Sequence, residues 1–162
     1  MKRKKSDLIE EIFFMMDDED DTALFSALSQ ITDWEQTDRD GRTVLLNAAL
    51  CNRTDIARLV LSLGANVNAA DKRGFTALHI AVQEENIDLI QLLVAYSADV
   101  NFQNSFGNPP IFLLKPNTPQ EIYNLLLASG ADPTIKNNYG NSAADIWKTT
   151  NFPQFVKDYI QP

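Results

Sequence analysis

Apolar residues recur at helical spacing in short segments separated by polar, glycine-containing loops, and this alternation repeats with a fixed period. Four glycines mark it, each 33 residues after the one before: Gly41, Gly74, Gly107 and Gly140. Other positions keep the same spacing: Asp55, Asp88 and Glu121; Leu59, Leu92 and Leu125; Ala65, Ala98 and Ala131. A period of about 20 to 50 residues is typical of stacked repeat proteins. The chain is therefore predicted to be an array of similar units.

Each period contains two apolar segments, and each segment predicts one short helix. In the first complete repeat these helices are expected over residues 43–50 and 55–63. One such pair is too small to bury its apolar face alone, so Ile56 is expected to pack near Leu89 of the next pair. Stability should therefore lie in contacts between neighbouring repeats.

The period divides the chain into one domain of five segments. These are an N-terminal cap over 6–37, three repeats over 38–70, 71–103 and 104–136, and a C-terminal cap over 137–162. In the caps, helices are expected over 6–16, 22–30, 142–149 and 153–160. The N-terminal cap admits a second interpretation, because Thr22-Ala23-Leu24 resembles Thr76-Ala77-Leu78. Against it, only 21 residues separate Thr22 from Thr43.

Two departures from the pattern carry structural expectations. In the third repeat, Pro116 blocks helix continuation because proline lacks an N–H and crowds the preceding turn. Its first helix is therefore expected to be short, over about 110–114, with the next helix restarting at Pro119 and an irregular inner surface around Leu114.

At the C-terminal end, Trp147 stands where Ala48 and Ala81 stand earlier. Its ring is expected to close the core.

The second repeat carries a recognisable motif. Residues 76–81 read Thr-Ala-Leu-His-Ile-Ala, and the loops read Gly-Ala-Asn-Val-Asn from Gly64 and Ser-Ala-Asp-Val-Asn from Ser97. This pattern resembles the ankyrin-repeat family, with its T-P-L-H-x-A signature and period of about 33 residues. The resemblance covers roughly residues 38 to 150. It implies an all-α solenoid with projecting finger loops, and a non-catalytic role in binding other proteins.

In ankyrin proteins the concave face is built from finger tips and the exposed side of the first helices, and the resemblance places candidate partner-binding residues there. From the fingers these are Arg39, Asp40, Arg42, Lys72, Arg73, Phe75, Ser105, Phe106, Asn108, Asn138 and Tyr139. From the first helices they are Leu50, Cys51, Gln83 and Glu84. The helix positions of the third repeat are left open, because its sequence departs from the motif.

Three finger aromatics stand at positions that the core does not need: Phe75, Phe106 and Tyr139. Exposed aromatic side chains are enriched among interface hot spots. We expect a binding ridge formed by these three residues and flanked by Arg42, Lys72 and Arg73. The alternative is that each ring packs against the adjacent finger. Replacing all three with alanine should leave folding intact and weaken partner capture.

The net charge indicates which class of partner to expect, and the cysteine content indicates the cellular compartment. The formal net charge is −8, which disfavours binding to the phosphate backbone of a nucleic acid and favours a basic protein partner. The single cysteine, Cys51, excludes an internal disulfide and is typical of a reducing compartment. No secretory signal follows the basic Lys2–Lys5 stretch, and no apolar run reaches the length of a membrane span. We therefore expect a cytoplasmic monomer.

The sequence offers little for catalysis. His79 is the only histidine, and its place in the ankyrin motif implies hydrogen bonds that tie neighbouring repeats together. Cys51 has no histidine near it in the repeat pattern to activate it, so we expect a partner contact or no function. No P-loop motif occurs, and we expect no metal, nucleotide or other cofactor.

Protein recognition is therefore the leading prediction, and two more specific roles stay open. The first is an inhibitor or immunity protein that blocks a basic toxin or enzyme, motivated by size and acidity. The second is a targeting subunit that presents an enzyme to its substrate. The acidic run Asp17–Asp21 is expected to be a solvated turn, with a docking patch for a basic partner as the alternative. An enzymatic role for the chain itself ranks last.

Overall fold

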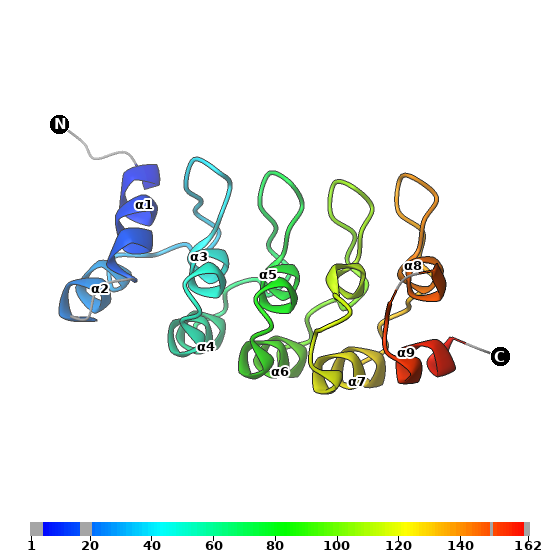
Figure 1. The fold of residues 1–162 in the computed structure, drawn as a ribbon. Helices are drawn as coiled ribbons and strands as arrows, with labels where there is room; N and C mark the ends of the chain where they lie inside the picture. Colours follow the sequence, from blue (N-terminus) through cyan, green and yellow to red (C-terminus); the bar gives the residue numbers. More distant parts are fainter. Residues whose placement is uncertain (1–4, 17–20, 150, 161–162) are drawn as a thin grey trace.

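The computed structural model describes residues 5–16, 21–149 and 151–160, and its helices lie in two rows that follow an N-terminal pair (Figure 1). The elements in chain order are α1 (Lys5–Met15), α2 (Asp21–Leu28), α3 (Val44–Leu50), α4 (Thr54–Ser62), α5 (Ala77–Gln83), α6 (Ile87–Ala95), the 3-10 helix η1 (Pro110–Leu113), α7 (Gln120–Ala128), α8 (Ala143–Thr149) and α9 (Gln154–Tyr159). Helices α3, α5, η1 and α8 form an inner row, and α4, α6, α7 and α9 form an outer row. The all-α solenoid that the resemblance implies is confirmed.

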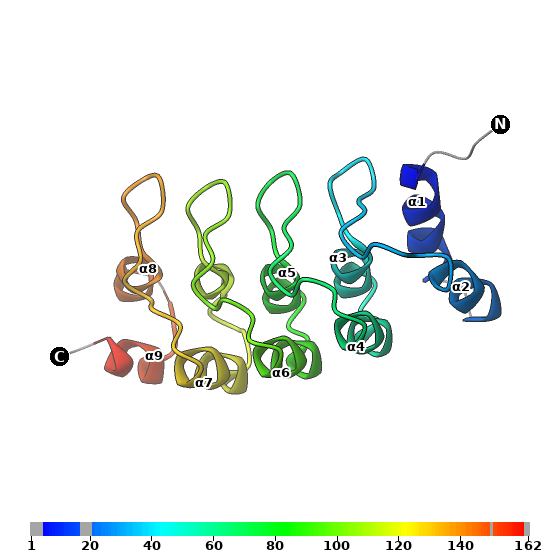
Figure 2. The ribbon, with the colours of Figure 1, turned by 180° about the vertical axis from the view of Figure 1, so that it is seen from behind.

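Four loops project from the inner row on the same side of the molecule (Figures 1 and 2). We call them fingers one to four, over residues 38–42, 71–75, 104–108 and 137–141. Each finger begins with an Asp or Asn whose Oδ1 accepts two backbone N–H groups of the same loop. In finger two, Asp71 accepts from Arg73 and Phe75, both at 2.8 Å. These side chains fix the loop locally, as Asx turns do.

The period-marking glycines share one backbone conformation, with φ between +74° and +79°. An L-residue is strained there, so glycine is the favoured residue. At Gly107 a second reason applies, because an added Cβ would lie 2.7 Å from the backbone nitrogen of Asn138 in finger four. Gly140, with no following finger, has open space at that point. The 33-residue spacing of these glycines therefore reflects two constraints, namely the left-handed conformation of the loop and the close approach of the next finger.

The core runs continuously through the stack. Ile56, Leu89, Leu93 and Ile122 are fully buried in it. Helix α3 begins after Thr43, whose side chain accepts the N–H of Leu46. Burial of apolar area between helix pairs, at about 25 cal/mol per Å², is the main stabilising term. Neighbour packing, as expected from the sequence, holds the array together.

The third repeat is irregular, as predicted, although its first helical segment differs in kind. The segment over Pro110–Leu113 is a single 3-10 turn instead of a short α-helix. Leu114 then adopts an extended conformation and is buried. A side-chain hydrogen bond stabilises the non-helical segment that follows: the hydroxyl of Tyr123 donates to the carbonyl of Lys115 at 2.6 Å. Burial raises the pKa of Tyr123, so the phenol stays protonated and can donate.

The two ends of the stack are closed differently. At the C-terminal end, Trp147 is 1% exposed, with its ring centroid 5.7 Å from that of Tyr123. The prediction that this ring closes the core is confirmed. At the N-terminal end, Arg53 donates to Asp21 and Asp55, at 2.9 and 2.8 Å. These carboxylates raise the pKa of Arg53 and fix α2 against α4. Residues 17–20 of the acidic run lie outside the described residues.

Candidate functional site

The fingers are connected to one another by a ladder of backbone hydrogen bonds. Lys72 N–H donates to the carbonyl of Asp40 at 3.1 Å, and Ser105 N–H donates to that of Arg73 at 2.9 Å. Asn138 N–H continues the series by donating to the carbonyl of Phe106 at 3.0 Å. The finger tips therefore stand at fixed spacing, which limits the entropy that a partner must remove on binding.

A groove of about 180 Å³ opens between the first two fingers and the inner helices. Its lining residues are Arg42, Leu50, Asp71, Arg73, Phe75, Ile80 and Gln83. Five of the candidate residues, Arg42, Leu50, Arg73, Phe75 and Gln83, are thus brought together. Asp71 and Ile80 were not among the candidates. Asp71 could have been found from its spacing, since Asp38, Asn104 and Asn137 keep the same 33-residue period.

Arg73 lies against two aromatic rings. Its guanidinium carbon is 5.1 Å from the ring centroid of Phe75 and 5.6 Å from that of Phe106. Cation–π contacts of this kind contribute about 0.5–1 kcal/mol at exposed sites. They also limit the movement of the guanidinium of Arg73, which lines the groove. The neighbouring Lys72 instead donates through Nζ to the carbonyl of Arg39.

The three finger aromatics differ in how exposed they are. Phe75 is half-buried, and its ring centroid is 5.4 Å from that of His79, so the structure uses this position for packing as well. Phe106 is 37% exposed and Tyr139 is 75% exposed. The three rings lie on successive fingers, but only Phe75 lines the groove.

A second, larger hollow of about 310 Å³ lies between α1 and finger one. It is lined by Glu10, Phe13, Phe14, Asp38, Arg39, Asp40 and Arg42. Arg39 and Glu10 form a two-point ion pair, and the hydrogen bonds from Arg39 lower the pKa of Glu10. Phe14 is 71% exposed. The sequence analysis did not place Phe13 and Phe14 at a site, because only the fold brings α1 beside finger one.

A comparison with models of protein families identifies the family that has this architecture. A family model described as ankyrin repeats in three copies matches residues 8–104, which is more than half of the chain. The chain belongs to the ankyrin-repeat family. Ankyrin repeats are general protein–protein interaction modules and are typically non-catalytic. The comparison with curated proteins gives no match.

Within this ankyrin chain, His79 joins two repeats. Its Nδ1 accepts the N–H of Thr76 at 3.2 Å, so its Nε2 carries the proton and donates to the carbonyl of Asn108 at 3.0 Å. The ring is fully buried, and this burial lowers the pKa of His79. A neutral imidazole is the form that makes both bonds, and the structural interpretation of His79 accounts for all of its contacts.

The remaining candidates of the ankyrin surface fall into two groups. Asn108 and Asn138 hold fingers together: Asn108 Oδ1 accepts from Asn137 at 2.8 Å, and Asn138 Nδ2 donates to the carbonyl of Ser105 at 3.0 Å. Another group is exposed, namely Arg39, Asp40, Glu84, Ser105 and Tyr139, although Arg39 is paired with Glu10 and Asp40 with Arg42. Cys51, expected at an exposed position, is half-buried at the end of α3.

Two further observations concern only the described part of the ankyrin chain. Over residues 5–16, 21–149 and 151–160, no group of three or more His, Cys, Asp or Glu side chains is placed to hold a metal ion. No helix in the same ranges is long and apolar enough to cross a membrane.

Proposed function

We propose that this ankyrin chain binds another protein through its finger surface, which we define as fingers one to four together with the groove between fingers one and two. The groove carries the proposal. It gathers Arg42, Arg73 and Phe75 around an apolar floor formed by Leu50 and Ile80. Arginine and aromatic side chains are the residue types enriched among interface hot spots.

The surface is also suited to binding by its rigidity. The finger ladder fixes the positions of Lys72, Ser105 and Asn138. Arg73 is held by two rings, so little side-chain entropy remains to be lost when a partner contacts it. Exposed Phe106 and Tyr139 extend the surface towards the C-terminal end and offer further apolar area.

Blocking of a basic enzyme is a second candidate role, and the net charge of −8 supports it. The acidic residues that share the 33-residue spacing, Asp55, Asp88 and Glu121, lie in the first turns of outer-row helices. Carboxylates there also stabilise the helices through the helix dipole. A basic partner captured at low salt and released at high salt would favour this role, whereas a neutral or acidic partner would exclude it.

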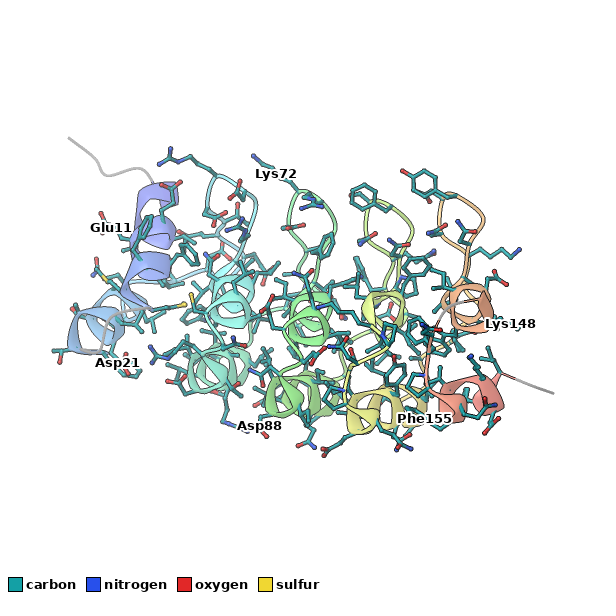
Figure 3. The ribbon with its side chains drawn as sticks, in the orientation of Figure 1. Glu11, Asp21, Lys72, Asp88, Lys148 and Phe155 are labelled. Carbon is teal, nitrogen blue, oxygen red and sulfur yellow. The ribbon has the colours of Figure 1, made fainter. Side chains whose placement is uncertain are left out.

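The proposed function is tested by site-specific photocrosslinking in the native cell. A photoreactive amino acid is placed at Gln83, in the groove, and in a matched variant at Asp88. Figure 3 shows Asp88 on the edge of the molecule opposite the finger tip that carries Lys72. We expect one protein to be crosslinked from position 83 and not from position 88. Crosslinks from position 88 alone would contradict the proposal.

A further inference from the structure

Arg73 differs from the other cationic side chains that surround the groove. Arg42 forms an ion pair with Asp40 at 2.8 Å. Lys72 donates to a backbone carbonyl of finger one. Among the residues that the structure describes, no carboxylate pairs with the guanidinium of Arg73. Its guanidinium carbon lies 5.1 and 5.6 Å from the centroids of two aromatic rings, and the residue is exposed, so a ligand can reach its N–H groups.

The one acidic residue in the groove lining does not neutralise Arg73. Asp71 Oδ1 accepts the backbone N–H groups of Arg73 and Phe75, both at 2.8 Å, and so serves the conformation of finger two. The groove lining therefore holds two guanidinium groups and one carboxylate that is engaged with the backbone. Because Arg42 is paired with Asp40, Arg73 is the cation of the groove lining for which the structure shows no carboxylate partner among the residues that it describes.

The chemistry of a stacked guanidinium selects its ligand. A planar guanidinium presents parallel N–H donors that match the two oxygens of a carboxylate, and contact with two rings limits how far that of Arg73 can move. The apolar floor beside it, formed by Leu50, Ile80 and the half-buried ring of Phe75, offers a place for an aliphatic or aromatic side chain. A groove of about 180 Å³ accommodates one such side chain and not a folded domain.

We propose that the groove binds an extended acidic segment of the partner protein, with an Asp or Glu carboxylate on Arg73 and an adjacent apolar side chain between fingers one and two. This inference rests on the proposed function of the finger surface. It adds the chemical class of the segment that is recognised: a carboxylate next to an apolar residue, rather than a basic segment.

The experiment uses a displayed library of random ten-residue peptides, selected against the 162-residue chain. Recovered peptides are synthesised with a fluorophore, and their affinities are measured by fluorescence anisotropy. We expect enrichment of Asp or Glu beside an apolar residue, and at least a tenfold loss of affinity when the peptide carboxylate is replaced by the corresponding amide. A charge-assisted hydrogen bond to an otherwise unpaired guanidinium accounts for a loss of this size.

Protein variants identify the residue responsible. Arg73→Gln should weaken the selected peptide at least tenfold, and Arg73→Lys should weaken it as well, because lysine keeps the charge and loses the planar fork. Lys72→Gln removes the same charge from the same finger and should change affinity less than threefold. Thermal unfolding of each variant checks that finger two is intact, and Arg42→Gln provides a second groove variant should Arg73→Gln unfold.

The outcomes separate this inference from the function on which it rests. The acidic-segment inference would be overturned if the selection recovered basic peptides or no peptides. It would also be overturned if Arg73→Gln left the affinity of the recovered peptides unchanged. Crosslinking from Gln83 could still succeed in each of these cases. Failure of crosslinking from position 83, with crosslinks from position 88, would remove the proposed function itself.

Discussion

The second and third repeats occupy equivalent places in the array but hold their inner segments in different ways. In the second repeat, α5 is a seven-residue α-helix whose first turn is closed by Thr76 and His79 in a capping box. In the third, Pro109 stands at the corresponding position without a side-chain cap, and four residues of 3-10 helix follow. Pro116, which follows this segment, explains its early end, since proline supplies no N–H and crowds the preceding turn.

Despite this difference, the fingers that precede the two segments share one conformation. Asn104 accepts the N–H groups of Phe106 and Asn108 in finger three, just as Asp71 accepts two N–H groups in finger two. Gly107 and Gly74 also have similar φ values, +77° and +74°. A finger is therefore specified by its own Asx residue, its glycine and the next finger, and it does not depend on a regular helix behind it. This separation lets the array vary its interior and still present a continuous finger surface.

The largest expected effect is a loss of unfolding free energy when a buried core leucine is replaced. Leu92 and Leu125 are 33 residues apart, but Leu92 is 4% exposed and Leu125 is only half-buried. Leu92→Ala should lower the free energy of unfolding by about 2–5 kcal/mol, the usual range for a buried leucine. Leu125→Ala should cost clearly less. Equal losses in urea unfolding would show that the two repeats contribute alike to the core.

A second comparison tests whether fingers depend on their neighbours. Gly107 and Gly140 have nearly the same φ, +77° and +78°, but only Gly107 has a following finger in contact. Gly140→Ala should cost about 1–2 kcal/mol, from the left-handed conformation alone. Gly107→Ala should cost about 1–3 kcal/mol more, because it also displaces Asn138 and weakens the ladder. Thermal denaturation of both variants measures the difference, and identical losses would contradict a role for the ladder.

A smaller effect isolates the substitute contacts of the third repeat. Tyr123→Phe removes the hydrogen bond to the carbonyl of Lys115 and should cost about 1 kcal/mol. Tyr139→Phe, at a side chain that is 75% exposed, provides the control and should leave stability unchanged. Unfolding in urea compares the two variants. No loss for Tyr123→Phe would mean that the irregular segment is held by packing alone.

The smallest effect concerns pH and belongs to the second repeat. Burial lowers the pKa of His79 below its ordinary value of 6.5, so the folded state binds a proton less readily than the unfolded chain. Stability is therefore full above pH 6.5 and falls as the pH drops through 6.5 towards the folded-state pKa. The loss should be about 1 kcal/mol or less between pH 6.5 and 5.5.

The control for the pH effect is His79→Gln, which removes the only histidine of the chain. Its unfolding free energy should be flat over this pH range. Lowered carboxylate pKa values, such as that of Asp55 through hydrogen bonds from Arg53, act at lower pH, because their contribution is lost only below the ordinary value of 3.8. A wild-type profile as flat as that of the variant would contradict a neutral, buried His79.

Much of the fold could be predicted from the sequence, because its determinants repeat with the period. The spacing of Gly41, Gly74 and their counterparts, the proline-rich third repeat and the ring of Trp147 all led to expectations that the structure confirms. What escaped prediction depends on contacts between side chains from different repeats. The contact of Arg73 with Phe106 joins adjacent fingers, and the hollow beside α1 depends on how the N-terminal helix is placed.

The residues of the candidate site could also be predicted only in part from the sequence. Arg42, Arg73, Phe75 and Gln83 were candidates from their positions in the motif, and the structure gathers them in one groove. The motif could not show that Phe75 is half-buried against His79, or that Asn108 and Asn138 are engaged in bonds between fingers. These assignments depend on which neighbouring side chains reach each position.

The account depends most on the finger surface being the place where a partner binds. Hydrogen–deuterium exchange of the chain, alone and in complex with the protein crosslinked through Gln83, tests this directly. We predict slower exchange on binding over residues 71–83 and 104–108, with α6 and α7 unchanged. Protection confined to α6 and α7, with the fingers exchanging as in the free chain, would contradict it.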